Sequence, residues 1–308
     1  MERLILSAAP HIRSRASTRT IMGDVLIALL PAVVASVVFF GPRALLLEAV
    51  CVGSAVLFEW GFQTLCKRPV TVGDLSAAVT GLILALNLHV GIPLWQAVFG
   101  SLVAIVVVKQ LFGGIGHNFA NPAITARIIL LLAFTDSMTT WELPNYSDAV
   151  SSATPLTILA SGDTAGLPSL WEMFLGVHGG CIGEPCTLAL TLGGVYLLAR
   201  RVITWQAPAA FIGTVFLFTA LLGLHPVYQI LSGSLFLGAF FMATDYTTTP
   251  ATGPGKLLFG VGCGLLTVVI RVWGSYPEGV SFSILFMNIL TPYIDKWTRS
   301  RPLGGEKG

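Results

Sequence analysis

The run Val25-Leu-Ile-Ala-Leu-Leu-Pro-Ala-Val-Val-Ala-Ser-Val-Val-Phe-Phe40 carries no charged side chain, and similar apolar runs recur along the whole chain. Of the 308 residues, 54% are hydrophobic and 10% are charged, whereas about 25% are charged in an ordinary soluble domain. In lipid, a helix is the only open-chain element that satisfies its own backbone hydrogen bonds. We therefore predict an all-α polytopic membrane protein. The composition excludes nucleic-acid binding and cytosolic enzyme activity.

Ten apolar runs, each bounded by glycine, proline or charged residues, predict about ten transmembrane helices. The runs cover residues 24–40, 44–65, 74–89, 94–112, 122–135, 184–199, 207–224, 229–244, 256–273 and 280–295. A mixed segment, 136–181, separates the fifth run from the sixth. Residues 1–308 are thus predicted to form a single integral membrane domain, whose halves 1–135 and 182–308 are joined by that segment.

The basic residues predict how these helices are oriented. If the basic amino-terminal tail is cytoplasmic, ten helices place 15 of the 17 Lys and Arg residues on the cytoplasmic side, Lys109 and Arg127 among them. Only Arg43 and Arg271 then lie on the other side. Because cytoplasmic loops are enriched in Lys and Arg, both termini are predicted to be cytoplasmic and segment 136–181 extracytoplasmic. The first residues lack a signal-peptide cleavage pattern, so we expect the N-terminus to be retained.

Ten helices divide into two halves of five, and an odd number per half predicts inverted repeats if the halves share a fold. One trace of a repeat is visible. Gly81 to Asn87 precedes Pro93 at the same interval at which Gly238 to Thr244 precedes Pro250; a chance match explains this spacing equally well. Both segments fall on short helices, the third and the eighth. Short helices of this kind often line a binding site in inverted-repeat proteins.

The heptad Asp148-Ala-Val-Ser-Ser-Ala-Thr154, followed by Pro155, is the most informative polar stretch. Composition alone favours a Ser/Thr-rich loop with a helix-capping role, open to solvent and presenting a hydroxyl. The heptad also resembles the flavinylation signature D-x-x-[S/T]-[S/G]-A-T, in which a dedicated flavin transferase moves FMN from FAD onto the final threonine. This resemblance implies a phosphoester between FMN and Thr154, with Asp148, Ser151, Ser152 and Ala153 completing the recognition motif.

Four further segments carry a family resemblance. They are Gly113-Gly-Ile-Gly-His-Asn-Phe-Ala-Asn-Pro-Ala123, Gly179-Gly-Cys-Ile-Gly-Glu-Pro185, Met242-Ala-Thr-Asp-Tyr-Thr-Thr-Thr-Pro250 and Tyr276-Pro-Glu-Gly279. With the heptad, they are similar to the RnfD/NqrB family over nearly the whole chain. That family comprises flavin-bearing membrane subunits of the Rnf ferredoxin:NAD oxidoreductase and of the sodium-pumping NADH:quinone reductase. The 308-residue length is closer to the Rnf branch.

The resemblance implies a subunit of an electron-transport complex that translocates Na⁺ or H⁺ across a bacterial inner membrane, with FMN on Thr154 carrying electrons between the ferredoxin-side and NAD-side subunits. Partners would be the other Rnf subunits, of the A, B, C, E and G types, an extracytoplasmic flavin transferase, and membrane lipid. A second, noncovalent flavin, riboflavin, is expected near the short helices. The residues alone also allow two other hypotheses for the function. One is an inverted-repeat solute channel of the urea-transporter type, and the other is a passive scaffold subunit that has lost its cofactor.

Several polar side chains have two interpretations each. Asn118 and Asn121 can contact a flavin pyrimidine edge, or Asn121 can cap the helix that Pro122 begins. Arg127 follows within that helix and needs a partner or a polar cavity, for flavin contact or otherwise. Glu184 and Asp245 lie near helix ends, where each is either a solvated carboxylate or an ion-coupling group.

Other candidate residues receive weaker assignments. Gly113, Gly114 and Gly116 lack the strand-to-helix context of a phosphate-binding fingerprint, so they pack helices or contact a cofactor. Glu48 and Glu59 lie on roughly one helix face and are expected to face a partner subunit. The C-x4-C pair of Cys181 and Cys186 is predicted to pack rather than to hold a cluster, and no catalytic residue or metal site is predicted.

Overall fold

The computed structural model describes residues 16–141, 154–161, 166–176, 178–184, 186–274 and 278–299. Within these ranges the chain is helical, with no strand, and every one of the ten apolar runs contains a helix. Three helices of the described chain are long and apolar enough to cross a membrane by themselves: α1 (Thr18–Phe40), α2 (Pro42–Leu65) and α13 (Gly253–Trp273). The prediction of an all-α polytopic membrane protein is confirmed.

The remaining elements are shorter, and two of them, η2 and η3, are π-helical. In the first half they are η1 (Val72–Asp74), α3 (Ser76–Leu86), α4 (Leu94–Leu102), η2 (Val103–Gln110), α5 (Pro122–Ala133) and α6 (Thr135–Thr139). They continue with α7 (Pro155–Ser161), α8 (Leu170–Leu175), α9 (Thr187–Ala199), α10 (Gln206–Leu221), α11 (Pro226–Leu231), α12 (Leu235–Leu237), η3 (Gly238–Met242) and α14 (Val280–Thr298). The segment expected to be a loop, 136–181, therefore contains short helices.

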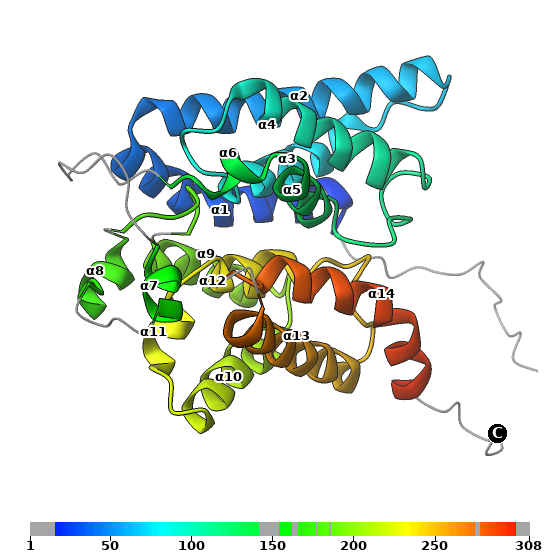
Figure 1. Cartoon of the computed structure of the whole chain (residues 1–308). Coiled ribbons are helices and arrows are strands. Elements are labelled where there is room, and N and C mark those ends of the chain that lie inside the picture. Colours follow the sequence, from blue (N-terminus) through cyan, green and yellow to red (C-terminus); the bar gives the residue numbers. More distant parts are fainter. Residues whose placement is uncertain are drawn as a thin grey trace, which may run out of the picture.

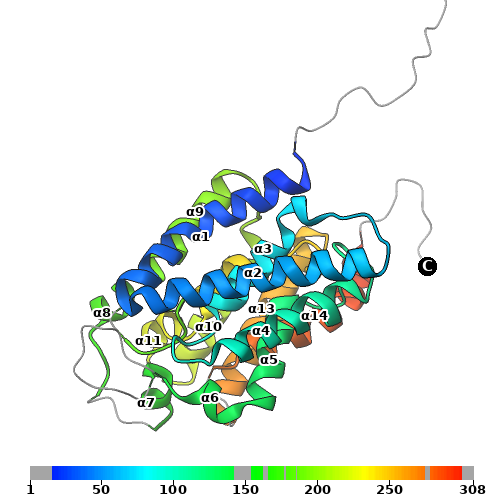
Figure 2. The same ribbon diagram turned by 90° about the horizontal axis from the view of Figure 1, so that it is seen from above.

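The two halves of the chain pack in the same order. In the first half α2 packs on α4, and α5 on η2; in the second half α10 packs on α13, and α13 on α14. The halves meet where α1 contacts α9 and where α5 contacts α14. Figure 1 shows the first-half helices in one group and the second-half helices in another, and Figure 2 shows α1 and α9 side by side. This is the arrangement expected of two related five-helix halves.

Close approach of α1 and α9 depends on glycine. A side chain at Gly193 would collide with the carbonyl oxygen of Ala28, so only glycine permits this spacing. The glycines at 113, 114 and 116 have a different role, because their φ angles are +125°, +97° and +88°. They shape the turn between η2 and α5, where a left-handed backbone favours glycine. Helix packing, one of the two interpretations of these three glycines, is therefore wrong, and contact with a cofactor stays a prediction.

The third helix of the first half ends inside the bundle. At ~1.5 Å per residue, the 11 residues of α3 extend about 16 Å, roughly half of the hydrocarbon thickness. Its free carbonyl groups need donors there, because lipid supplies none. The N–H of Ile182 donates to Leu88 O at 2.8 Å and the N–H of Gly183 to Leu86 O at 2.9 Å. The segment before α9 thus completes the end of α3.

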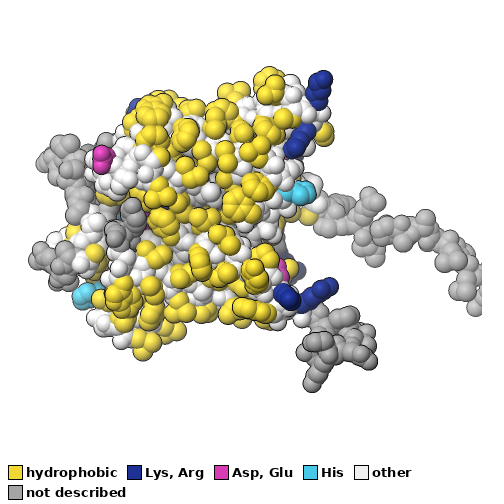
Figure 3. Space-filling model, turned by 45° about the vertical axis from the view of Figure 1, so that its right-hand side comes forward, with side chains coloured by type: hydrophobic (Ala, Val, Ile, Leu, Met, Phe, Trp, Pro, Cys, Tyr) yellow, Lys and Arg dark blue, Asp and Glu magenta, His cyan; other side chains and the backbone are white. Residues whose placement is uncertain are grey.

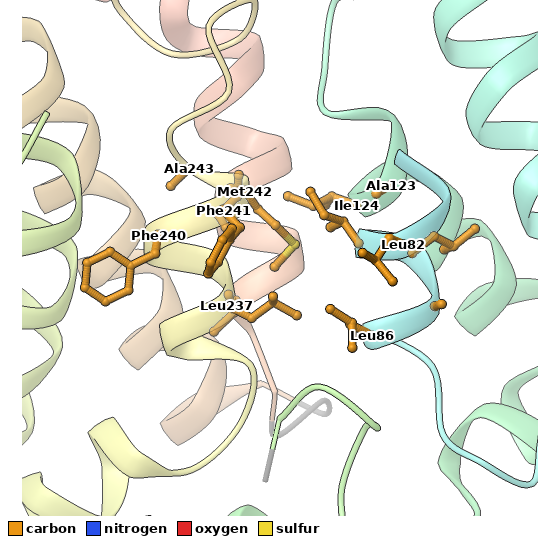
Figure 4. Packing of buried hydrophobic residues seen from close by; sticks show 14 of the residues in the cluster. Leu82, Leu86, Ala123, Ile124, Leu237, Phe240, Phe241, Met242 and Ala243 are labelled. Atoms are coloured by element: carbon orange, nitrogen blue, oxygen red, sulfur yellow. The ribbon is translucent and has the colours of Figure 1, made fainter. Parts of the chain in front are cut away.

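A single large core cluster draws buried apolar residues from both halves. Figure 4 shows its centre, where side chains of α3 and α5 face those of α12 and η3. The labelled residues are Leu82, Leu86, Ala123, Ile124, Leu237, Phe240, Phe241, Met242 and Ala243. The short helices of the two halves therefore bury one another's apolar side chains at the middle of the molecule.

Large apolar side chains are exposed on most of the longer helices of the described chain, as contact with lipid requires. Figure 3 shows hydrophobic side chains covering the middle of the face in view and most of its Lys and Arg side chains at the right-hand end. The described chain begins, at α1, and finishes, at α14, at the right-hand end of Figure 1. We call this the terminal end, and the opposite end, which carries α7 and α8, the α7 end.

Candidate functional site

A cavity of ≈330 Å³ lies between the two halves, and its lining includes Thr18 and Ile21 at the start of α1, at the terminal end. Its walls are mainly apolar, with Val25 of α1, Ile83 of α3 and Phe240 of η3 among them, and Asn118 and Asp245 supply polar groups. The cavity therefore joins the glycine-rich segment 113–123 to segment 242–250, which lie in different halves of the sequence. Ligand sites of roughly this size combine apolar walls with a few fixed polar groups.

Asn121 is a helix cap, as one of its two interpretations predicted. Its Oδ1 accepts from the N–H of Ala123 at 3.1 Å and of Ile124 at 3.3 Å, and its Nδ2 donates to Met242 O at 3.3 Å. One side chain thus starts α5 and ties it to η3 of the other half. Asn118 Nδ2 donates to Ala120 O at 3.1 Å. Both asparagines line the cavity.

Asp245 lies at the cavity wall just beyond η3. Its Oδ2 accepts from Thr248 Oγ1 at 3.1 Å, and its Oδ1 from the N–H of Thr247 at 3.4 Å. The carboxylate is half-buried, so it is neither fully solvated nor sealed in the core. It is the acidic side chain among the described residues that line this cavity.

A buried ion pair forms part of the cavity wall, since its lysine, Lys109, lines the cavity. Lys109 Nζ donates to both carboxylate oxygens of Glu59 at 2.9 Å and to Ser76 Oγ at 2.6 Å. Gln110 Nε2 donates to the same carboxylate at 2.7 Å, because the π-helical turn of η2 brings two consecutive residues to one partner. Lys109 and Glu59 are 3% and 1% exposed. The expectation that Glu59 faces a partner subunit is wrong. The placement of Lys109 on the cytoplasmic side stays a prediction.

A second polar site, here called the polar cluster, surrounds Arg127 of α5. Arg127 Nε donates to Asn87 O at 3.1 Å, which satisfies another carbonyl at the end of α3. Its Nη1 donates to Ser281 Oγ, and its Nη2 pairs with Glu278 and donates to Cys181 Sγ at 3.4 Å. The side chain is buried and does not line the cavity. Asn118, Asn121 and Arg127 were predicted together as possible flavin contacts, but Arg127 lies in a different site from the two asparagines.

Glu184 belongs to the polar cluster. It is 4% exposed, so the interpretation of a solvated carboxylate at a helix end is wrong. Its Oε2 accepts from the N–H of Cys181 at 3.2 Å. Ligand atoms of Cys181, Glu184 and Glu278 lie within 4.8 Å of one another. The guanidinium of Arg127 contacts two of these three side chains and supplies a positive charge among them.

Arg271 of α13 is the main functional candidate that sequence reasoning missed. It is 7% exposed, and it donates to Gln229 Oε1 at 3.2 Å, Ser232 O at 3.0 Å and Glu278 O at 3.4 Å. A charge inside an apolar run costs free energy in lipid unless it is partnered. The position of Arg271 inside an apolar run could therefore have identified it as a partnered, buried charge. In the sequence analysis it was used only to predict the orientation of the helices.

Thr154 is the one residue of the heptad that the structure describes. Its Oγ1 accepts from the N–H of Thr157 at 3.3 Å, so it caps the first turn of α7. The residue is 6% exposed, so the expectation of an open strip is wrong at this position. The cause is the packing of α7: a Cβ at Gly233 would lie 2.8 Å from both Leu156 Cδ1 and Arg271 Nη2. The first turn of α7 therefore lies beside Arg271.

The other members of the predicted motif, Asp148, Ser151, Ser152 and Ala153, lie outside the described residues. The five cysteines are free thiols. Cys181 and Cys186 are both described, and Cys181 contacts Arg127 rather than packing only against apolar groups.

The chain is similar to known proteins over nearly its whole length. Residues 5–304 match the model of the NQR2, RnfD, RnfE family. The chain is 47% identical over 306 residues to a protein of Acetobacterium woodii named as the D-type subunit of the Na(+)-translocating ferredoxin:NAD(+) oxidoreductase complex, covering 99% of this chain and 96% of the relative. It is 41% identical to the D-type subunit of the proton-translocating ferredoxin:NAD(+) oxidoreductase complex of Clostridium ljungdahlii, with 97% and 96% covered. A third relative, the D-type subunit of the ion-translocating oxidoreductase complex of Halorhodospira halophila, is 38% identical, with 97% and 95% covered.

Proposed function

The chain belongs to the NQR2, RnfD, RnfE family, and from this premise we propose that it is the D-type subunit of an ion-translocating ferredoxin:NAD⁺ oxidoreductase complex. The complex is a translocase, and the chain works with the other Rnf subunits rather than alone. Its place is a bacterial inner membrane, with both termini cytoplasmic. The observation that carries the proposal is a sequence identity of 38–47%, over nearly the full length, to relatives named as this subunit. A solute channel without a cofactor has no comparable support.

We propose that FMN is joined covalently to Thr154 by a phosphoester, on the extracytoplasmic side. The heptad supports this, as does the position of α7, whose Leu156 lies near Arg271, because the positive charge of the arginine suits a phosphate. When bound, the flavin supplies one- or two-electron transfer. The chain provides the hydroxyl that holds it. Because Thr154 is buried, the transferase must act while α7 is away from its packed position.

The terminal-end cavity is our proposed site for the second flavin, riboflavin, held without a covalent bond. Apolar side chains such as Phe240 and Ile83 suit the faces of a planar ring, and Asn118 and Asp245 suit its polar edge. The helix that follows Thr154, α7, lies at the end of the bundle opposite the start of α1, where Thr18 lines the cavity. Two flavins so placed would give the chain one electron carrier near each membrane surface.

The subunit assignment is tested in membranes from a strain that lacks the chain. Ferredoxin-dependent NAD⁺ reduction is expected to disappear and to return when the full chain is supplied in trans, together with ion uptake into inverted vesicles. The reaction requires electron transfer between subunits, so a missing membrane subunit stops it. Undiminished NAD⁺ reduction and ion uptake in the deletion strain would contradict the assignment.

Filling the cavity tests the second flavin. The Val25→Trp substitution places a larger side chain in the cavity wall, and acid extraction of the purified complex is then expected to yield no riboflavin, while FMN on Thr154 is retained. Ile27→Trp is the matched control, because Ile27 lies on the same helix but is 51% exposed at the outer surface. Equal riboflavin content in the two variants would argue against this site.

A further inference from the structure

Glu48 of α2 is a buried carboxyl group that neither proposed flavin site uses. It is 3% exposed and lies six residues after Pro42, the first residue of α2. At ~1.5 Å per residue, this places it about 9 Å along the helix from the α7 end. Its neighbour across the helix pair is Ser36 of α1. The expectation that Glu48 faces a partner subunit is wrong, because the side chain points into the chain itself.

The hydroxyl of Ser36 makes two short contacts. Its Oγ lies 2.7 Å from Val33 O and 2.7 Å from Glu48 Oε1. Each distance is typical of a fully formed O–H···O hydrogen bond, but a serine hydroxyl has one proton to donate. Val33 O is a carbonyl and can only accept. Both bonds form together when Glu48 carries a proton on Oε1 and donates it to Ser36 Oγ, while Ser36 donates to Val33 O.

No basic group in the described chain is paired with Glu48, since the ion pairs there join Lys109 to Glu59, Arg127 to Glu278 and Arg200 to Asp24. The second oxygen, Oε2, is buried without a hydrogen-bond partner. An ionised carboxylate in this setting would lack both counter-charge and donors, which is costly in a membrane. A neutral carboxyl group avoids most of that cost.

The titratable groups on the elements packed against this part of α2 are few. They are Arg43 and Cys51 on α2 itself and His89 in the segment after α3. Arg43 donates to Val90 O at 3.5 Å and to Ile92 O at 3.2 Å, so its bonds go to backbone carbonyls. From residue 25 to the end of α1, and throughout α3 and α4, there is no titratable side chain.

We propose that Glu48 is a proton-binding site within the membrane, formed between α1 and α2. Binding adds one proton to Oε1, and the new O–H bond donates to Ser36 Oγ. Release returns that proton to water. Ser36 is then left with one hydroxyl proton for two acceptors, Val33 O and Glu48 Oε1. Protonation therefore completes the hydrogen-bonded link from Glu48 through Ser36 to Val33. The inference does not depend on either flavin.

The test is labelling of the intact complex with dicyclohexylcarbodiimide, followed by mass spectrometry of its peptides. A protonated carboxyl group adds across the carbodiimide, and the O-acylisourea formed rearranges to a stable N-acylurea whose mass is the sum of the two reactants. We expect the adduct on Glu48 and its loss as the pH is raised. Glu59 is an internal control, because its carboxylate is equally buried but paired with Lys109, and it is expected to stay unlabelled.

Two comparisons complete the design. Glu48→Gln is expected to lose the adduct and keep the complex assembled, because its amide still donates to Ser36. Added Na⁺ at constant ionic strength is expected to leave labelling unchanged. A complex that shows no adduct on Glu48 at acidic pH overturns the proposal, and so does protection of Glu48 by Na⁺, which would identify a sodium site instead.

Discussion

Replacing Thr154 with alanine is expected to give a complex that assembles but shows no flavin fluorescence on this chain after denaturing electrophoresis. The proposed phosphoester needs the threonine hydroxyl, and alanine has none. Ferredoxin-dependent NAD⁺ reduction is expected to fall to the level of membranes that lack the chain. In-gel fluorescence and the NADH assay measure the two effects on the same preparation.

Two control variants separate attachment from folding. Thr154→Asn keeps a side-chain oxygen that can cap α7 but has no hydroxyl, so it is expected to lose the flavin and keep the stability. Thr157→Ala removes the neighbouring hydroxyl, which donates to Thr154 O at 2.7 Å, and is expected to retain the flavin. Fluorescence that survives in Thr154→Asn would mean that another residue carries the cofactor.

Arg127→Met is expected to destabilise the chain more than any other single change discussed above. Removing one partner of a buried ion pair costs about 3–5 kcal/mol, because the other charge is left without compensation. Here Glu278 loses its cation, and Asn87 O, at the buried end of α3, loses its donor. The effect is measured as a lowered unfolding temperature of the detergent-solubilised complex.

Arg43→Met is the matched control, since Arg43 is exposed and bonds only to the backbone carbonyls of Val90 and Ile92 among the described residues. Its unfolding temperature is expected to stay near that of the wild type. Glu278→Gln combined with Arg127→Met is expected to recover part of the loss, because the stranded charge is then removed. Equal unfolding temperatures for Arg127→Met and Arg43→Met would refute the role assigned to the polar cluster.

Much of the fold could be predicted from the sequence because lipid imposes a simple rule. A spanning segment must be apolar and helical, so the ten runs mark where helices form. The end of α3 inside the bundle could not be located in this way, because its donors, Ile182 and Gly183, come from the other half of the chain. Hydropathy describes single segments and carries no information about which segments complete one another.

The candidate sites were predicted only in part for the same reason. Asn121 could be identified as a cap because the signal is local: an asparagine followed by proline at a helix start. The pairing of Arg127 with Glu278 could not, since 151 residues separate the two in sequence. The pairing of Lys109 with Glu59 could not be predicted either, because a lysine at the end of an apolar run usually reaches water and 50 positions separate the two residues in sequence.

The two ends of the molecule differ in a way that bears on the proposed function. The terminal end has a cavity lined by one acidic and two asparagine side chains, while Arg271, which donates to Glu278 O of the polar cluster, lies near Leu156 of α7. The described residues of the heptad and of the four other family segments, Thr154, 113–123, 179–184, 242–250 and 278–279, lie toward one or other of these ends. We therefore propose a different flavin for each end, covalent FMN at the α7 end and riboflavin in the cavity.

The most direct measurement is the intact mass of the proteolytic peptide that contains Thr154, taken from the purified, fully assembled complex. A phosphoester between FMN and Thr154 predicts a mass increased by one FMN less one water, with fragment ions that place the addition on Thr154. A peptide of unmodified mass, from a complex that is otherwise complete and active in NAD⁺ reduction, would contradict it.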